Sequence, residues 1–325
     1  MSLFTHDEIE RAAQLVHRSV PATPQYAWPT LAERTGCTVW VKHENHTPTG
    51  SFKVRGAHTF IDWLERTHPD IGSIVSATRG NHGQGMARAG TAAGLGVHIV
   101  VPRGNSSEKN AAMRAFGATL TEHGADFDEA RGEARRLADE GGHFLVPSFH
   151  TELVRGVASY AFELFSAVPD LDTVFVPIGC GSGIAATIAV RDALGLATRI
   201  VGVVSSEAQA AKTSVDSGHL VSTETAATMA DGIAVREPVP EALAIYATGA
   251  ERIVTVTDDE VCEAMRVYFQ DTHNVAEGAG AAPLAALLAE RERHAGNQVG
   301  VILCGGNVDT AVFAEVLAGR TPAPF

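Results

Sequence analysis

Short apolar runs alternate with alanine-rich amphipathic stretches along almost the whole chain, and this alternation limits the fold more than any other feature. Several runs are continuously apolar, among them Val174–Ile178 (Val-Phe-Val-Pro-Ile) and Val299–Leu303 (Val-Gly-Val-Ile-Leu). A strand without polar alternation is typical of a parallel sheet that is covered on both faces. The alternation with helices therefore predicts an α/β fold with open, mostly parallel sheets.

Nine segments are predicted as strands, more than one compact parallel unit needs, so we expect two packed subdomains. The strands are 38–44, 74–78, 97–101, 119–123, 144–147, 173–178, 199–205, 253–257 and 299–304. The predicted helices between them are 84–93, 107–116, 126–140, 152–167, 184–193, 258–271 and 283–292. At the start of the chain, Thr5 and Glu8 form the pattern of a capping box before a further helix.

Composition excludes several classes of function. The formal net charge is −13 over 325 residues and no basic run occurs, which argues against a nucleic-acid surface. No apolar run approaches the roughly 20 residues that span a bilayer, and the N-terminus lacks the pattern of a signal peptide. The four cysteines are scattered, so neither a zinc site nor a disulfide framework is expected. These features predict a cytoplasmic protein that binds neither membrane nor nucleic acid.

Lys53 is one of only four lysines, and it lies between Phe52 and Val54 after a small-residue turn that opens a helix. A lysine in such a place can be partly desolvated, which lowers its pKa and frees the amine. A free amine is what a covalent bond to an aldehyde cofactor requires. From these residues alone, a surface lysine at a helix start remains the alternative.

A glycine-rich loop, Gly179-Cys180-Gly181-Ser182-Gly183, follows the predicted strand 173–178 and opens a helix. Small residues at this place let backbone N–H groups converge on an anion, and the N-terminus of the helix favours negative charge. The loop therefore predicts a phosphate site. It fits neither the Walker pattern nor the dinucleotide fingerprint, and a tight turn without ligand remains the alternative.

A second polar turn, 78–85, also connects a strand to a helix. Glycines such as Gly80 permit close approach of the backbone, and N–H groups at the start of the helix could bind a carboxylate. Asn81 could form a hydrogen bond with a cofactor hydroxyl group. For His82, these residues favour a structural role over a catalytic one.

Two further motifs lie near the C-terminus. Cys304 ends the strand 299–304 and so faces the carboxyl edge of the sheet, where open α/β sheets bind ligands. A small buried side chain is the alternative. The segment Glu277-Gly278-Ala279-Gly280-Ala281 opens a helix with small residues and one carboxylate.

Taken together and in order, these motifs resemble the fold-type-II pyridoxal-phosphate enzymes, and within them the serine/threonine dehydratase and serine racemase branch. The resemblance spans nearly the whole chain. The motifs are Glu44-Asn45, Thr49-Gly50-Ser51-Phe52-Lys53-Val54-Arg55-Gly56-Ala57, Gly80-Asn81-His82-Gly83-Gln84, the loop after Val176-Pro177-Ile178, Ala230-Asp231-Gly232-Ile233-Ala234-Val235, Glu277-Gly278-Ala279-Gly280-Ala281 and Cys304-Gly305-Gly306-Asn307-Val308-Asp309.

The resemblance implies a role for each of these residues toward pyridoxal 5′-phosphate. Lys53 would carry the cofactor and move the Cα proton. Arg79, where the chain differs from the family, is predicted separately as a second catalytic residue: it could bind the substrate carboxylate or a polar or anionic group on the β-substituent, or assist the departing hydroxyl group. An arginine turned to solvent or paired with a surface carboxylate is the alternative. The cofactor would be held by Phe52, Lys53, Asn81, Gly179, Cys180, Gly181, Ser182, Gly183 and Cys304, with Asn81 at the 3′-oxygen and Cys304 at the ring nitrogen. The substrate would be bound by Ser51, Thr78, Arg79, Gly80 and His82. No metal ligand is expected.

The chain departs from the family pattern at three places. Arg79 replaces the second serine of Ser-Ser-Gly-Asn-His, the serine that exchanges protons in racemases, and an arginine does not shuttle protons easily. Cys180 and Ser182 stand where four glycines are common. The strand end that supplies a carboxylate to a cation site in the family reads Gly202-Val203-Val204, which argues against a metal there.

The resemblance implies a large cofactor-binding domain of residues 1–69 and 150–325, a small mobile domain of residues 70–149, and no regulatory domain. It also implies a homodimer. The expected activity is dehydration and deamination of a β-hydroxy-α-amino acid, an ammonia-lyase reaction that yields a 2-oxo acid. Threonine, serine, 3-hydroxyaspartate and phenylserine remain open as substrates. An amino-acid racemase, a β-replacement synthase and a non-enzymatic phosphate-binding protein are the alternatives.

Overall fold

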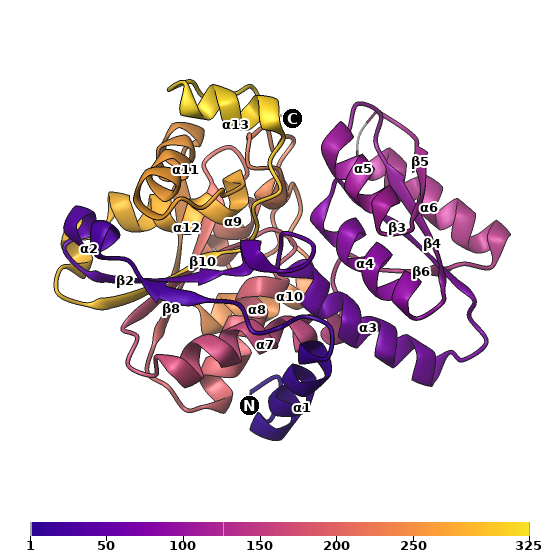
Figure 1. Cartoon of the computed structure of the whole chain (residues 1–325), viewed down its shortest axis with the longest axis horizontal. Helices are drawn as coiled ribbons and strands as arrows, with labels where there is room; N and C mark the ends of the chain where they lie inside the picture. The colour runs from indigo at the N-terminus through magenta and orange to yellow at the C-terminus, as the bar shows by residue number, and fades with distance from the viewer. Residues whose placement is uncertain (1, 126, 325) are drawn as a thin grey trace.

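The computed structural model describes residues 2–125 and 127–324, and it has two β-sheets flanked by helices (Figure 1). The larger sheet has six strands in the order β1-β2-β10-β7-β8-β9. Their bounds are β1 Gln25–Ala27, β2 Thr38–His43, β7 Thr173–Pro177, β8 Arg199–Ser205, β9 Arg252–Val256 and β10 Gln298–Leu303. All pairs are parallel except β1 with β2, so five carboxyl ends point to the same edge.

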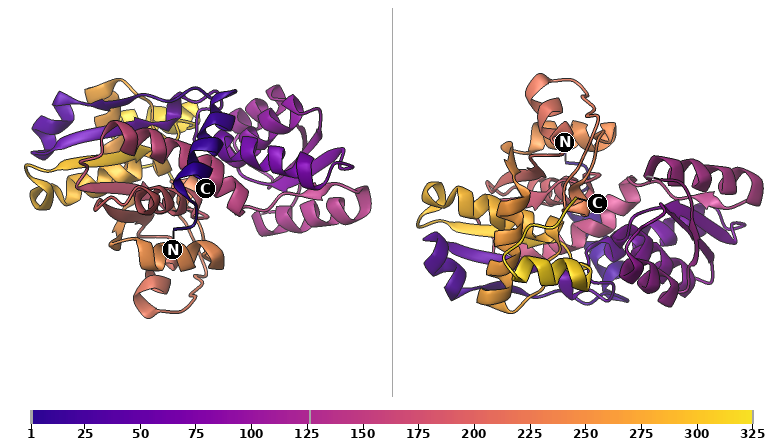
Figure 2. Two further views of the ribbon diagram at one scale, coloured as in Figure 1. Left: turned by 90° about the horizontal axis from the view of Figure 1, so that it is seen from below. Right: turned by 90° about the horizontal axis from the view of Figure 1, so that it is seen from above.

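The smaller sheet has four parallel strands in the order β5-β4-β3-β6. Their bounds are β3 Ser73–Ala77, β4 Gly96–Val101, β5 Thr119–Glu122 and β6 Phe144–Leu145. This sheet forms a separate lobe beside the larger one, and the views from below and above show the same separation (Figure 2). The expected α/β fold with two mostly parallel sheets is confirmed.

Helices cover both sheets. The α-helices are α1 His6–His17, α2 Pro29–Thr35, α3 Lys53–Thr67, α4 Asn81–Ala92, α5 Ser107–Ala115, α6 Phe127–Gly141, α7 Thr151–Ala167, α8 Ser182–Ala193, α9 Ala210–Ser217, α10 Pro240–Gly249, α11 Asp258–Thr272, α12 Gly278–Ala289 and α13 Thr310–Leu317. Single 3₁₀ turns are η1 Glu44–His46, η2 Asp231–Ile233 and η3 Arg291–His294. Among the described residues, no helix is both long and apolar enough to cross a membrane.

The nine predicted strands are all present, with ends that differ by two residues at most. The capping box at Thr5 is also confirmed, because its hydroxyl accepts from the Glu8 amide and the Glu8 carboxylate accepts from the Thr5 amide. Asp126, the predicted first residue of one helix, lies outside the described residues. The short elements β1, α2, α9, α10 and α13 were not predicted, since none has a long periodic apolar pattern.

Helix α12 begins five residues before the predicted start at Pro283, which lies inside the helix. Tertiary packing explains the difference. Gly280 packs so closely on the strand-end segment that a Cβ atom there would lie 2.5 Å from the carbonyl oxygen of Gly305. Gly280 is therefore needed for close contact between the helix and the backbone after β10.

Helix α3 connects the two lobes. Its residues Ala57, Phe60 and Leu64 belong to the buried apolar cluster of the smaller sheet, with Met86 of α4. The same helix also packs against α7, which covers the larger sheet. Because α3 contacts both lobes, its packing does not assign it to one of them. The domain boundary near residue 70 and the mobility of the smaller lobe therefore stay predictions.

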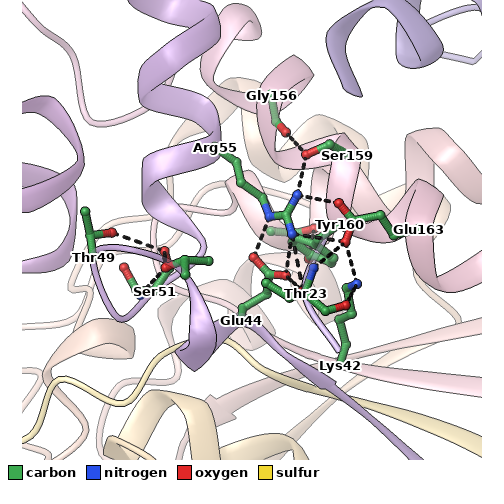
Figure 3. Close-up of polar contacts among 12 residues, drawn as sticks. Thr23, Lys42, Glu44, Thr49, Ser51, Arg55, Gly156, Ser159, Tyr160 and Glu163 are labelled. Atoms are coloured by element: carbon green, nitrogen blue, oxygen red, sulfur yellow. Dashed lines mark hydrogen bonds and ion pairs between the residues drawn. The ribbon is translucent and has the colours of Figure 1, made fainter. Parts of the chain in front are cut away.

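A buried polar cluster fixes the start of α3 (Figure 3). The fully buried guanidinium of Arg55 donates from Nε to Glu44 Oε2 at 2.6 Å and from Nη1 to Glu163 Oε1 at 2.6 Å. Lys42 Nζ donates to Glu163 Oε2 at 2.5 Å. Two cations and two carboxylates therefore compensate each other, and they join β2, η1, α3 and α7 just beside Lys53.

Candidate active site

Lys53 is the first residue of α3, and the backbone around it is held against the end of β10. Ser51 pairs with Gly305 in an isolated bridge, and the Phe52 amide donates to the Cys304 carbonyl oxygen at 3.0 Å. Lys53 Nζ donates to Ser182 Oγ at 3.4 Å and lies 4.8 Å from the centre of the Phe52 ring. The structure thus brings the predicted lysine next to the predicted phosphate loop.

The phosphate loop connects β7 to α8. Within the described part of the chain, the backbone N–H groups of residues 179–184 donate to no protein acceptor. Gly181 has φ of 92°, a left-handed conformation that glycine adopts without strain. A Cβ atom at this position would lie 2.6 Å from Ala242 Cβ, so the glycine is needed both for the turn and for the packing of α10. Free amides at the start of a helix are what a bound phosphate requires.

The second predicted loop follows β3 and opens α4. Gly80 donates to Thr78 Oγ1 at 3.0 Å, whereas the amides of Asn81, His82 and Gly83 have no acceptor among the described residues. Burial, and then the charge of Lys53, lower the pKa of His82 to about 3. A neutral imidazole leaves the amides as the groups that could bind a carboxylate.

Asn81 occupies the centre of a hydrogen-bonded chain. Its Nδ2 donates to Glu277 Oε1 at 2.7 Å, and its Oδ1 accepts from Asn307 Nδ2 at 2.8 Å. Asn307 Nδ2 also donates to the Thr49 carbonyl oxygen at 2.8 Å. The smaller lobe is thereby joined to the segment after β10. The predicted contact of Asn81 with the cofactor oxygen stays a prediction.

Cys304 lies at the carboxyl end of β10, as predicted, and its thiol is buried. Burial, strengthened by the charge of Glu277, raises the pKa of Cys304 well above its ordinary value. The side chain is therefore a neutral thiol at physiological pH. A neutral thiol can donate a hydrogen bond to the ring nitrogen of the expected cofactor without holding that nitrogen protonated.

Three further polar residues converge on this place without a role predicted from the sequence. Glu277, at the N-terminus of α12, is buried, and its Oε2 atom has no partner among the described residues. Lys109 of α5 is buried and forms an ion pair with Asp231 of η2. The motifs around Asp231 and Glu277 were visible as part of the family pattern, whereas Lys109 carried no signal beyond being one of four lysines.

Glu277 has an unusual protonation equilibrium, which gives a testable pH dependence. Burial raises the pKa of Glu277 to about 7. The positive charge of Lys109 acts against this rise, and the negative charge of Asp231 adds to it. Between pH 4.5 and 7 the folded protein therefore retains a proton that the unfolded chain has lost. By linkage, this group makes the folded state less stable as the pH rises through that window.

Replacing Glu277 with glutamine removes the titration and keeps an oxygen that can accept from Asn81. We expect the free energy of unfolding of Glu277→Gln to rise relative to the parent protein by about 1–3 kcal/mol from pH 4.5 to pH 7.5. Denaturant unfolding of both cofactor-free proteins at several pH values measures this difference. Parallel stability curves would show that Glu277 is ionised across the range.

Arg79 lies in the second loop, between Thr78 and Gly80, and is half-buried. It lines a cavity of about 150 Å³ together with Arg103, Asp231 and neighbouring residues of the smaller lobe. No hydrogen bond or ion pair joins its side chain to another described residue. Among the described residues there is also no group of three or more His, Cys, Asp or Glu side chains that could hold a metal ion.

Comparison with known proteins agrees with this arrangement. The family described as "Pyridoxal-phosphate dependent enzyme" matches residues 16–305. The chain belongs to this family, and its cofactor is pyridoxal 5′-phosphate. The resemblance to the fold-type-II enzymes is therefore confirmed. The lysine beside a loop of free amides fits an aldehyde cofactor that carries a phosphate.

Two curated relatives and one solved structure are informative. The chain is 32% identical over 320 residues to an L-threo-3-hydroxyaspartate ammonia-lyase from Pseudomonas sp., covering 98% of this chain and 100% of that protein. It is 33% identical over 305 residues to a biosynthetic L-threonine dehydratase from Haemophilus influenzae, covering 93% of this chain but only 59% of that protein. A crystal structure of an aspartate racemase has a TM-score of 0.90 at 27% identity, covering 96% of this chain and 98% of that one.

Proposed function

We propose that this protein eliminates water from a β-hydroxy-α-amino acid and releases a 2-oxo acid and ammonia. The observation that carries the proposal is the place of Lys53, whose Nζ lies 3.4 Å from Ser182 Oγ in the phosphate loop, at the start of α8. An amine at that point can serve both as the attachment for an aldehyde and as a base. The names of the two curated relatives, both of them lyases or dehydratases of hydroxy amino acids, support this choice of reaction.

Pyridoxal phosphate supplies an acceptor for the electron pair that is left on Cα when its proton departs. The chain supplies the remaining groups. Loop 179–183 would hold the phosphate through its amides, Phe52 would pack beside the ring, and Cys304 would contact the ring nitrogen as a neutral thiol. A nitrogen without a full proton favours rapid elimination over chemistry that needs a long-lived carbanion.

Binding of the amino acid is assigned to the second loop. The free amides of Asn81 and His82, at the positive end of α4, would donate hydrogen bonds to the α-carboxylate, with Thr78, Gly80 and Ser51 around it. Lys53 would then take the Cα proton onto Nζ, and the β-hydroxyl group would leave as water once it has gained a proton. The released enamine takes up water and yields the 2-oxo acid and ammonia.

A racemase needs a second proton donor on the opposite face of the substrate. In the family pattern a serine hydroxyl supplies it, and here Arg79 occupies that position. A guanidinium stays protonated at any physiological pH and does not exchange its proton readily. This difference supports elimination over racemisation, although an aspartate racemase has the same fold.

A panel of β-hydroxy amino acids tests the proposal. Threonine, serine, phenylserine and the 3-hydroxyaspartate isomers are incubated with the holoenzyme, and 2-oxo acid and ammonia are measured together. We expect equal amounts of the two products from at least one substrate. The same reactions with an added thiol detect a β-replacement synthase, and chiral analysis of recovered substrate detects a racemase. Inversion or replacement without 2-oxo acid would contradict the proposal.

A further inference from the structure

A cavity of about 150 Å³ lies between the lobes, and loops after three neighbouring strands form it. Arg79 follows β3, Arg103 follows β4, and Ala125 follows β5. These strands are adjacent and parallel, so their carboxyl ends meet at one edge of the smaller sheet. Asp231 of η2 closes the cavity from the larger lobe. The place is therefore built from both lobes and not from a single surface loop.

Arginine side chains are the unused hydrogen-bond donors of this cavity. The other polar side chains that line it have partners: Asn105 donates to Asn110 Oδ1 at 2.7 Å, and the Ser106 hydroxyl donates to Asp309. By contrast, no hydrogen bond or ion pair holds the guanidinium of Arg79 or Arg103 among the described residues. Two planar forks of donors are thus available to a ligand.

The charge of the cavity favours an anion. Its one lining carboxylate, Asp231, is paired with the buried Lys109, so its charge is compensated. The Glu129 carboxylate nearby accepts a hydrogen bond from the Ala125 amide at 2.9 Å. Two arginines remain without a counter-ion in a chain of net charge −13. A carboxylate matches a guanidinium in both charge and shape, because two parallel N–H···O bonds can form.

The cavity lies beside the proposed substrate site. Arg79 immediately precedes Gly80 and Asn81, next to the free amides assigned to the α-carboxylate. On the other wall, Gly232 follows Asp231 and touches the phosphate loop, since a Cβ atom at Gly179 would lie 2.3 Å from the Gly232 carbonyl oxygen. A substituent on the β-carbon of a bound amino acid would therefore be near Arg79 and Asp231.

We propose that Arg79 and Arg103 bind a second carboxylate, carried on the β-carbon, and that the substrate is a β-hydroxy-α-amino dicarboxylic acid. The inference rests on the proposed elimination reaction and adds its substrate class. For 3-hydroxyaspartate the reaction balances without a further reactant: the Cα–H and Cβ–OH bonds break, water leaves, water then hydrolyses the enamine, and oxaloacetate and ammonia are the products.

The test compares kcat/KM for 3-hydroxyaspartate with kcat/KM for threonine, which has a methyl group in place of the second carboxylate. The parent enzyme should prefer the dicarboxylic substrate by at least ~10-fold, the scale of a charge-assisted hydrogen bond. Arg103→Gln and Arg79→Gln should each lower that ratio by at least ~10-fold. Arg114→Gln, an exposed arginine of the same lobe that faces Glu122, is the matched control and should leave the ratio unchanged.

Inhibition by succinate and by butyrate gives a second reading without turnover of the inhibitor. These acids have the same chain length and differ in one carboxylate. Succinate should inhibit the parent enzyme at least ~10-fold more strongly than butyrate, and Arg103→Gln should remove that difference. An unchanged succinate advantage in both arginine variants would overturn the inference.

The substrate panel separates the failure of this inference from that of the proposed function. Turnover of threonine or serine without turnover of any 3-hydroxyaspartate isomer would leave the elimination reaction standing and overturn the dicarboxylate site. An equal loss of activity toward both kinds of substrate in Arg103→Gln would overturn it as well. No 2-oxo acid from any β-hydroxy amino acid would overturn the proposed function, and the substrate class with it.

Discussion

Replacing Lys53 with alanine is expected to lower turnover by at least ~10³-fold, because one side chain would lose both the attachment of the cofactor and the base for the Cα proton. The fold should survive the change. Lys53 Nζ makes one long hydrogen bond, to Ser182 at 3.4 Å, and no ion pair among the described residues. Its removal should change the free energy of unfolding by less than about 1 kcal/mol.

Borohydride reduction followed by mass spectrometry measures the attachment directly. The parent protein should retain the mass of the reduced cofactor on the peptide that contains Lys53, whereas Lys53→Ala should retain none. Lys212→Ala is the matched control, since Lys212 lies on α9 and pairs with Asp216 at 2.6 Å on the surface. Near-normal activity of Lys53→Ala, or labelling of another lysine, would refute the assignment.

The parallel strands were predictable from the sequence because burial on both faces makes them continuously apolar. The strand Arg199–Ser205 has the predicted bounds at both ends, and β10 is shifted by a single residue. Strand β1 was missed because Gln25–Ala27 is short, antiparallel and mostly exposed, so no apolar run marks it. The local pattern of apolar residues therefore identifies strands that are buried on both faces. It overlooks an exposed strand such as β1, which is held only by its pairing with β2.

The family resemblance predicted that Lys53, Ser182 and Cys304 share one cofactor site. For Ser182 and Cys304 the pattern of the sequence supports this as well, since both follow predicted parallel strands, whose carboxyl ends meet at one edge. Pairings between distant polar or charged residues cannot be predicted from the sequence. Lys109 and Asp231 are 122 residues apart, and Asn81 and Glu277 are 196 apart. Neither periodicity nor composition encodes such pairs, and only the packing of the lobes brings them together.

Arg55 is the clearest example of a residue whose partners could not be predicted from the sequence. It belongs to the motif around Lys53, but the sequence assigned it no role. In the structure its guanidinium is fully buried between Glu44 and Glu163, 11 and 108 residues away, and it also donates to Ser159 Oγ at 2.9 Å. Arg55 follows Lys53 by two residues on α3, so the cluster holds the segment that carries the proposed catalytic amine.

Arg55→Met is expected to reduce the free energy of unfolding by about 3–5 kcal/mol, because it removes the guanidinium that pairs with both buried carboxylates, Glu44 and Glu163. Denaturant unfolding measures the loss. Arg66→Met on the same helix is the matched control: Arg66 and Asp62 form an exposed pair, so the expected change stays within about 0.5 kcal/mol. Adding Glu44→Gln to Arg55→Met should recover part of the loss, since one unpaired charge disappears.

The pH dependence of the free energy of unfolding is a second test of the predicted effect of Arg55→Met. Burial alone would raise the pKa of Glu163, but the charges of Arg55 and Lys42 outweigh it and lower the pKa to about 2. The unfolded chain therefore binds this proton first as the pH falls. The stabilisation is present above pH 4.5 and is lost between pH 4.5 and 2. Arg55→Met should lose much of this acid dependence, because the main charge that depresses the pKa is gone. A variant as stable as the parent, with the same acid profile, would mean that the buried cluster contributes nothing to folding.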